Sequence, residues 1–149
     1  MPSFEFPLLS LLRVRRMLEH QQHLALQRAN QVVAASQQRI ADANASLRAS
    51  QMAWTKAGAR ATSAELQFLR DCEHNCRLAI AQAQQEHIKL VSQAAAERDK
   101  YLNMKRQSEV LQHLHDQALD NWRIEEARRE QQKVDEMFLM RHASVQRNR

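Results

Sequence analysis

Glycine and proline are almost missing from this chain of 149 residues, which contains one glycine, Gly58, and two prolines, Pro2 and Pro7. No alternating run of valine, isoleucine and threonine is bounded by turn residues, so strand signals are missing as well. Aromatic residues make up only 5% of the chain, too few for a large globular core. These absences exclude sheet folds. The abundant alanine, glutamine, leucine, arginine and glutamate are typical of long helices and coiled coils.

Long apolar runs are also lacking, and none approaches the ~20 residues that a membrane span needs. The opening MPSFEFPLLSLLRVRR is a poor signal peptide, because its acidic residue precedes a short apolar run and its arginines follow it. We therefore expect a cytoplasmic protein without direct membrane insertion. The net charge of +5 and the pI near 9.8 indicate acidic partners. Nucleic acid is not expected, since no known binding motif or aromatic platform for bases is present.

Catalytic and metal-binding patterns are missing too. A single glycine excludes a glycine-rich phosphate loop, there is no HExxH motif, and His113 and His115 diverge on a helix. In DCEHNC, Cys72 and Cys76 share one helical face while His74 points roughly the opposite way, so the three cannot converge on one metal. Two reduced thiols packed between helices are the better interpretation. We expect no enzyme, no cofactor and no metal, since a two-helix rod has no deep pocket.

The sequence does contain a heptad repeat. Large residues recur seven apart, and small residues recur seven apart between them: Leu26, Val33, Ile40, Leu47 and Trp54, with Ala29, Ser36, Ala43 and Ser50. This 3-4 spacing lasts about four heptads, which strongly indicates a coiled coil.

The segment TKAGARATSAEL is the one break in the helical pattern. Gly58 can adopt a left-handed helix cap, and Thr62 with Glu65 has the spacing of a capping box. A short connection between two amphipathic helices folds them into an antiparallel hairpin. The predicted fold is all-α: one coiled-coil hairpin over 1–149, with a first helix about 7–55, a bend about 56–62 and a second helix about 63–144. Pro7 is expected in the first helical turn, with Ser3 or Glu5 near the cap.

The second helix carries a longer apolar stripe. Its members are Leu69, Cys72, Cys76, Ala79 or Ile80, Ala83, Leu90, Ala94, Tyr101, Met104, Leu111, Leu114, Ala118 and Trp122. Two polar residues, His87 and Glu97, interrupt this stripe, and we interpret them as long side chains that reach out of a narrow seam.

The two helices differ in length. At ~1.5 Å per residue the first reaches roughly 75 Å and the second roughly 120 Å. Folding back at Gly58 places Leu8 near residue 108, so the helix beyond about Leu111 has no partner within the hairpin. Apolar residues continue there, and an exposed stripe of that length usually marks a binding face. The alternatives are a homodimer, or a kink that returns the tail onto the first helix.

Basic residues flank the two chain ends that this arrangement predicts as a binding region. They are Arg13, Arg15 and Arg16 near the N-terminus, and Arg123, Arg128, Arg129, Lys133 and Arg141 around the tail's apolar residues Val134, Met137 and Phe138. Because acidic residues are interleaved with them, most could be ordinary solvating charges.

The tail RREQQKVDEMFLMR resembles the C-terminal signature of the flagellar export protein FliJ family. Its matching residues are Arg128, Gln132, Lys133, Val134, Asp135, Glu136, Met137 and Arg141. The opening FPLLSLLRVRRMLEHQQHLAL is similar to the start of the same family, and the resemblance covers almost the whole chain.

The resemblance implies the central stalk of the flagellar type III export ATPase. It implies that a hexameric export ATPase (FliI-like) binds the two chain ends. The implied binding residues are Arg13, Arg15, Arg16, Arg128, Arg129, Lys133, Val134, Met137, Phe138 and Arg141. It also implies an export gate (FlhA-like cytoplasmic domain) that contacts Leu47, Trp54, Phe68, Cys72 and Asn75 near the bend. This sequence departs from the family there, because Cys72 and Asn75 replace small or aliphatic residues and the first helix has no tyrosine.

Export chaperones are further implied partners, and the implied location is cytoplasmic, peripherally associated with the inner membrane through the export apparatus. A monomer is expected. The alternatives are the equivalent stalk of a virulence type III secretion system and a homodimeric coiled-coil scaffold.

Overall fold

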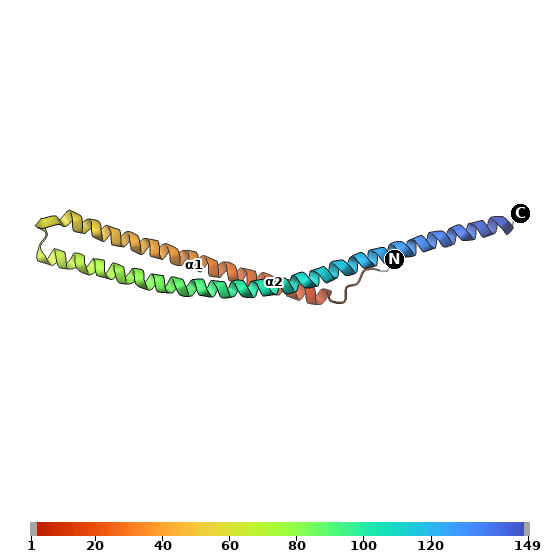
Figure 1. Cartoon of the computed structure of the whole chain (residues 1–149), viewed down its shortest axis with the longest axis horizontal. Coiled ribbons are helices and arrows are strands. Elements are labelled where there is room, and N and C mark those ends of the chain that lie inside the picture. The colour runs from red at the N-terminus through yellow and green to blue at the C-terminus, as the bar shows by residue number, and fades with distance from the viewer. Residues whose placement is uncertain (1–2, 148–149) are drawn as a thin grey trace. The chain divides into compact units, whose positions relative to one another are not determined.

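The computed structural model describes residues 3–147, and the side chains of residues 3–143. Two α-helices account for most of these residues: α1 (Leu9–Ala57) and α2 (Ser63–Arg147), joined through the short 3-10 helix η1 (Gly58–Arg60) (Figure 1). The two helices pack against each other antiparallel, and α2 is the longer, which confirms the predicted all-α hairpin.

The chain before α1 is not helical. Residues 3–6 have no regular structure, and Pro7 and Leu8 form a turn in which the Leu9 N–H donates to the Phe6 carbonyl at 3.1 Å. The Leu12 N–H then donates to the Leu8 carbonyl at 2.9 Å. Helix α1 therefore begins at Leu9, and Pro7 lies in the turn before it rather than in its first helical turn.

The bend is built by the residues that the sequence indicated. Gly58 has a φ of +54°, a left-handed conformation that side chains with a Cβ rarely adopt. The Thr62 N–H donates to Glu65 Oε2 at 2.8 Å, and the Glu65 N–H donates to Thr62 Oγ1 at 3.3 Å. This reciprocal pair confirms the predicted capping box at the start of α2. The hydrogen bond from the Thr62 backbone holds the pKa of Glu65 below its usual value.

The chain divides into two compact units, which are described separately. The hairpin unit is His20–Asn103, and the terminal unit combines Met1–Glu19 with Met104–Arg149. In the hairpin unit the heptad positions of α1 form the inner seam. Leu26, Val33, Ile40, Leu47 and Trp54 are half-buried there, as are Ala29 and Ala43, while Ser36 and Ser50 are buried.

Two polar residues of α2 lie inside this seam, so the interpretation that they reach out of it is wrong. His87 Nδ1 lies 2.7 Å from Ser36 Oγ, and the Ser36 hydroxyl donates to the Val33 carbonyl at 2.7 Å. Because a hydroxyl has one hydrogen, Ser36 Oγ accepts from the His87 Nδ1–H. A half-buried polar side chain thus stays inside the seam because the opposite helix supplies its partner.

The second polar position of the seam is Glu97. The Gln22 side-chain amide donates to the Glu97 carboxylate, and also to the Glu97 backbone carbonyl at 3.3 Å. Lys100, one turn further on, donates to the same carboxylate at 2.8 Å. The Lys100 contact and then the Gln22 contact lower the pKa of Glu97 from its ordinary value. His87 and Glu97 therefore make the seam of the hairpin unit partly polar, and each of them has a partner on α1.

Candidate functional site

The terminal unit fixes where the pairing of the two helices ends. Leu12 is its most buried residue, with 2% of its surface exposed. Arg15 donates to the Gln107 side chain at 2.7 Å, and Arg16 donates to that of Gln112. The expectation that Leu8 lies near residue 108 is therefore wrong by about one heptad.

The reason lies in where the chain reverses. The hairpin pair Ser36 and His87 has its sequence midpoint beyond η1 rather than at Gly58. The residues of η1 and the capping box lengthen the connection, so each position of α1 meets a later residue of α2 than a reversal at Gly58 predicts.

The N-terminal segment extends the pairing further along α2. The Phe4 and Phe6 rings meet the His115 ring at centroid distances of 5.6 and 5.1 Å, and Phe4 also lies 6.0 Å from the Trp122 ring. These distances are typical of aromatic pairs. The partnered part of α2 thus reaches Trp122, and the prediction that it ends at about Leu111 is wrong. An extended chain advances about 3.3 Å per residue, twice the helical rise, so a few residues cover two turns of α2.

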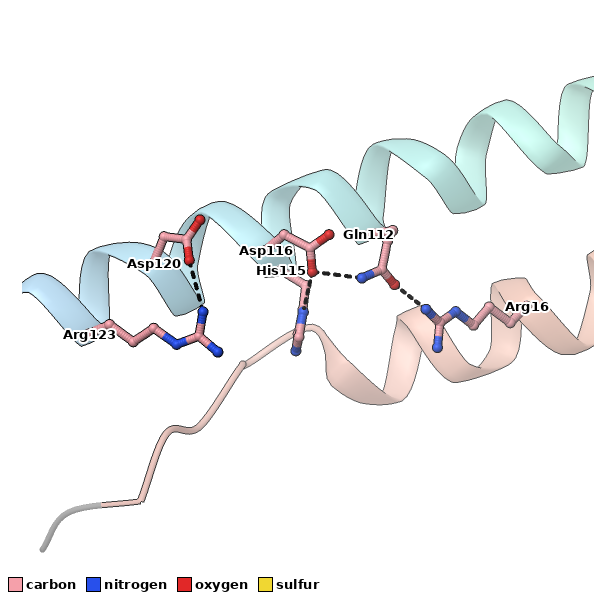
Figure 2. Close-up of polar contacts among 6 residues, drawn as sticks. All are labelled: Arg16, Gln112, His115, Asp116, Asp120 and Arg123. Carbon is pink, nitrogen blue, oxygen red and sulfur yellow. Dashed lines mark hydrogen bonds and ion pairs between the residues drawn. The ribbon is translucent and has the colours of Figure 1, made fainter.

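Figure 2 shows a chain of polar contacts beside this aromatic group. The Gln112 side chain accepts from Arg16 of α1 and donates to Asp116 Oδ1 at 2.7 Å. His115 Nδ1 lies 3.1 Å from the same carboxylate oxygen. The His115 contact is the main cause of the lowered pKa of Asp116. These contacts hold the His115 ring, which the two phenylalanines meet.

Beyond Trp122 the helix continues without a covering segment among the described residues. Every described side chain from 127 to 143 is exposed. The helix is supported by contacts between its own turns: Arg129 lies 3.7 Å from Glu125 and 3.5 Å from Glu126, and Gln131 donates to Asp135 at 2.9 Å. Such pairs add about 0.2–0.5 kcal/mol each to helix stability. We call residues 127–147 the tail.

Most of the tail's apolar residues lie off the continued seam, although Leu139 falls on its spacing. The seam of the terminal unit follows a 3-4 spacing through Ser108, Leu111, His115, Ala118 and Trp122. The same spacing, continued, meets mainly polar residues such as Arg129 and Glu136. The stripe of Val134, Met137, Phe138 and Arg141 lies roughly a third of a turn around the helix from that line, at about 100° per residue. This stripe is therefore a surface distinct from the one that α1 covers.

Four successive apolar residues mark the tail. Met137, Phe138, Leu139 and Met140 are 56%, 62%, 66% and 70% exposed. Successive residues of a helix point about 100° apart, so these four surround the whole circumference. Val134, Met137, Phe138 and Arg141 also line a small cavity of about 190 Å³. From Met137 to Arg147 the sequence contains no acidic residue.

The predicted ring-binding residues do not gather in one place along α2. Arg15 and Arg16 lie beside Gln107 and Gln112, whereas Arg128 is sixteen residues beyond Gln112, about 24 Å along the helix. Some of these basic residues are engaged internally: Arg15 is half-buried, and Arg129 pairs with two glutamates of its own helix. All members of the set except Arg15 are exposed: Arg13, Arg16, Arg128, Arg129, Lys133, Val134, Met137, Phe138 and Arg141.

The predicted gate-binding residues fall into two groups within the hairpin unit. Leu47 and Trp54 are half-buried in the seam, and Cys72 is half-buried beside it, with a free thiol as in Cys76. Phe68 is 67% exposed and Asn75 is exposed as well. Phe68 borders an open groove of about 680 Å³ next to the bend, which is lined by Ala53, Lys56, Ala57, Ala64, Glu65, Phe68 and Leu69.

Sequence reasoning missed the aromatic group around His115 and overestimated the exposed part of the stripe. Leu111, Ala118 and Trp122 are half-buried, while Leu114 is 43% exposed beside the seam rather than in it. The signal that could have found the contact was the pair Phe4 and Phe6, two of only four phenylalanines, placed before the helix.

In the described part of the chain, no group of three or more histidine, cysteine, aspartate or glutamate side chains is arranged to hold a metal ion. None of the described helices is long and apolar enough to cross a membrane.

Two long antiparallel helices that pack through a 3-4 seam define the class of helical, coiled-coil proteins. The chain belongs to the family described as flagellar FliJ protein, whose model matches residues 4–147. This family is one of structural stalk proteins of the flagellar export apparatus, and no enzymatic activity is known for it. No match was found among curated proteins or among solved structures.

Proposed function

We propose that this chain is the stalk that couples a hexameric flagellar export ATPase to the export gate. One observation carries the proposal: the tail is a helix outside the hairpin with apolar residues on all sides between Met137 and Met140. A flat partner, such as a second helix or a membrane surface, covers one side of a helix only. A ring that encloses the helix covers every side, which is the geometry that the lumen of a hexamer supplies.

The charge of the tail's end supports the same partner. The stretch from Met137 to Arg147 carries Arg141 and Arg147 and no acidic residue. A cationic, apolar helix end is complementary to acidic loops around apolar side chains, and opposite charge speeds encounter between partners. From Arg128 to Glu136 three basic and three acidic residues balance, so the net positive charge is confined to the end of the tail.

The gate contact is proposed at the bend. Exposed Phe68 beside the open groove offers the kind of aromatic anchor that dominates protein interfaces. Asn75 adds an exposed polar group two turns further along α2, while Leu47, Trp54 and Cys72 support this region from inside or beside the seam. Export chaperones are proposed as further partners of the chain. The proposed location is the cytoplasm, with peripheral association to the inner membrane through the export apparatus.

The test is stimulation of ATP hydrolysis. Added to the purified flagellar export ATPase, the chain is expected to raise the hydrolysis rate. Val134→Asp or Phe138→Asp is expected to abolish that rise, because a carboxylate is placed one turn before the enclosed stretch or within it. The matched control is Ile88→Asp: Ile88 is 61% exposed, close to the 62% of Phe138, but lies in the hairpin unit.

The outcomes separate the competing functions. Loss of stimulation in both tail variants and its retention in Ile88→Asp supports the stalk. Equal stimulation by all variants overturns the ring contact. A stable dimer that Phe138→Asp dissociates indicates the homodimeric scaffold instead. Stimulation of a virulence-type ATPase, but not of the flagellar enzyme, assigns the chain to a virulence secretion system, against the flagellar family that it matches.

A further inference from the structure

We infer that residues 3–8 form a detachable strap that covers the last partnered turns of α2 and sets where its exposed part begins. The strap contacts α2 through the side chains of Phe4 and Phe6. Phe4 and Phe6 are half-buried, although no regular structure includes them. The Leu9 N–H bond to the Phe6 carbonyl, at 3.1 Å, anchors the strap to the start of α1.

The aromatic contacts place the strap on the seam of α2. Phe6 meets the His115 ring at 88° between ring planes and Phe4 meets it at 78°, so both rings contact the imidazole in an edge-to-face arrangement. Phe4 continues to Trp122, two turns further along the same seam. The strap thereby covers seam positions for which α1, starting at Leu9, supplies no residue.

The polar contacts of His115 and its neighbours hold the His115 ring in place independently of the strap. Asp116 accepts from His115 and from Gln112, and Gln112 accepts from Arg16 of α1 (Figure 2). No strap residue is needed for these bonds. The strap can therefore leave while His115 and the pairing of α1 with α2 remain, because the helices keep their own contacts at Arg15 and Leu12.

Detachment has a definite consequence for the exposed surface. With the strap in place, the uncovered part of α2 starts after Trp122; without it, Ala118 and Trp122 join that surface, which adds about two helical turns. The strap and any partner that advances along α2 from the tail would compete for these turns. This last step rests on the proposed function, but the strap itself does not.

The experiment reads Trp122 directly. In a Trp54→Phe background, where Trp122 is the only tryptophan, Phe4→Ala/Phe6→Ala is expected to shift the emission to longer wavelength and to raise acrylamide quenching. The helical signal at 222 nm should hardly change, because residues 3–8 lie outside α1 and α2. The matched control is Phe138→Ala, which removes an equally large ring from the tail and should leave Trp122 emission as it is.

A second measurement tests whether the strap opens on its own. In the same single-tryptophan protein, urea should expose Trp122 at a lower concentration than it melts the helical signal, since a terminal segment outside the helices opens before the cooperative part. Unchanged Trp122 emission in Phe4→Ala/Phe6→Ala would overturn the covering contact, and coincident urea transitions would overturn its independent opening. Neither readout involves the ATPase, so failure of ring binding leaves the strap result standing, and the reverse also holds.

Discussion

Single polar residues decide the register of the seam. Ser36 and His87 meet across it at 2.7 Å, and Gln22 meets Glu97. A chain rich in alanine and glutamine offers many nearly equivalent ways to pair two helices, and a one-heptad shift would keep small residues opposite small ones. Half-buried polar pairs penalise such shifts, because each shifted partner would lose its hydrogen bond.

The Ser36 and His87 pair gives a test at this scale. Ser36→Ala leaves the His87 Nδ1–H without its acceptor, and the expected loss is about 1–2 kcal/mol of the free energy of unfolding. The double variant Ser36→Ala/His87→Leu removes both polar groups and should recover most of that loss. Urea unfolding followed by circular dichroism measures both. If the double variant is less stable than Ser36→Ala alone, the polar pair does not act as described.

The capping box gives a pH-dependent test. The pKa of Glu65 is lowered in the folded chain, mainly by the Thr62 backbone hydrogen bond. A lowered folded pKa means that the stabilisation is fully present above the unfolded value of about 4.3 and is lost as the pH falls through the folded value. Glu65→Ala should therefore lower the melting temperature by a few degrees at pH 7 and by less at pH 3.

A double-mutant cycle isolates this contact from other effects of pH. Thr62→Ala and Glu65→Ala should be less than additive at pH 7, because each removes the same reciprocal pair. Additive losses at pH 7, or a Glu65→Ala effect that stays constant down to pH 3, would argue against the capping box as the cause.

At the scale of the elements, α2 consists of a packed part and an exposed part that are stabilised differently. Up to Trp122 it packs through a 3-4 seam, and after it the exposed tail relies on bonds between its own turns. A long helix can persist in this way, because propagation needs only one hydrogen bond per added residue once the helix is nucleated. The paired part of α2 supplies that nucleus.

A pair of charge substitutions separates the two parts of α2. Ile40→Asp places a carboxylate in the half-buried seam and should cost about 2–4 kcal/mol of hairpin stability. Val134→Asp places the same charge on a residue that is 55% exposed, where the midpoint of thermal unfolding should not move. Thermal melts at 222 nm compare the two. A collapse of the helical signal in Val134→Asp would show that the tail residue packs inside the protein.

The elements themselves were predictable from the sequence, and their register was not. Heptad spacing and the Thr62–Glu65 pair determine local structure, so the helices and the start of α2 could be read directly. The register depends on how many residues the bend uses and on which polar groups find partners. Neither property follows from the spacing of residues along the sequence, and for this reason the sequence predicted His87 and Glu97 outside the seam. The strap was missed because no repeat pattern describes Phe4 and Phe6 in an irregular segment.

For the whole molecule, the central claim is that α2 extends beyond the part that α1 and the strap cover, and that its end binds an enclosing ring. Family membership supports a role in flagellar export, and the all-round exposure of Met137 to Met140 supports enclosure. The competing whole-molecule account is a dimer in which a second copy covers the same tail. Both accounts need a partner at the tail, so the identity of that partner decides between them.

The most direct measurement is site-specific photo-crosslinking from the tail. A photoreactive benzoylphenylalanine replaces Phe138 in one protein and Ile88 in another, two positions of nearly equal exposure. With the purified export ATPase present, we expect the probe at 138 to form a crosslink to the ATPase and the probe at 88 to form none. A crosslink from 138 to a second copy of this chain, or equal crosslinking from both positions, would contradict the account.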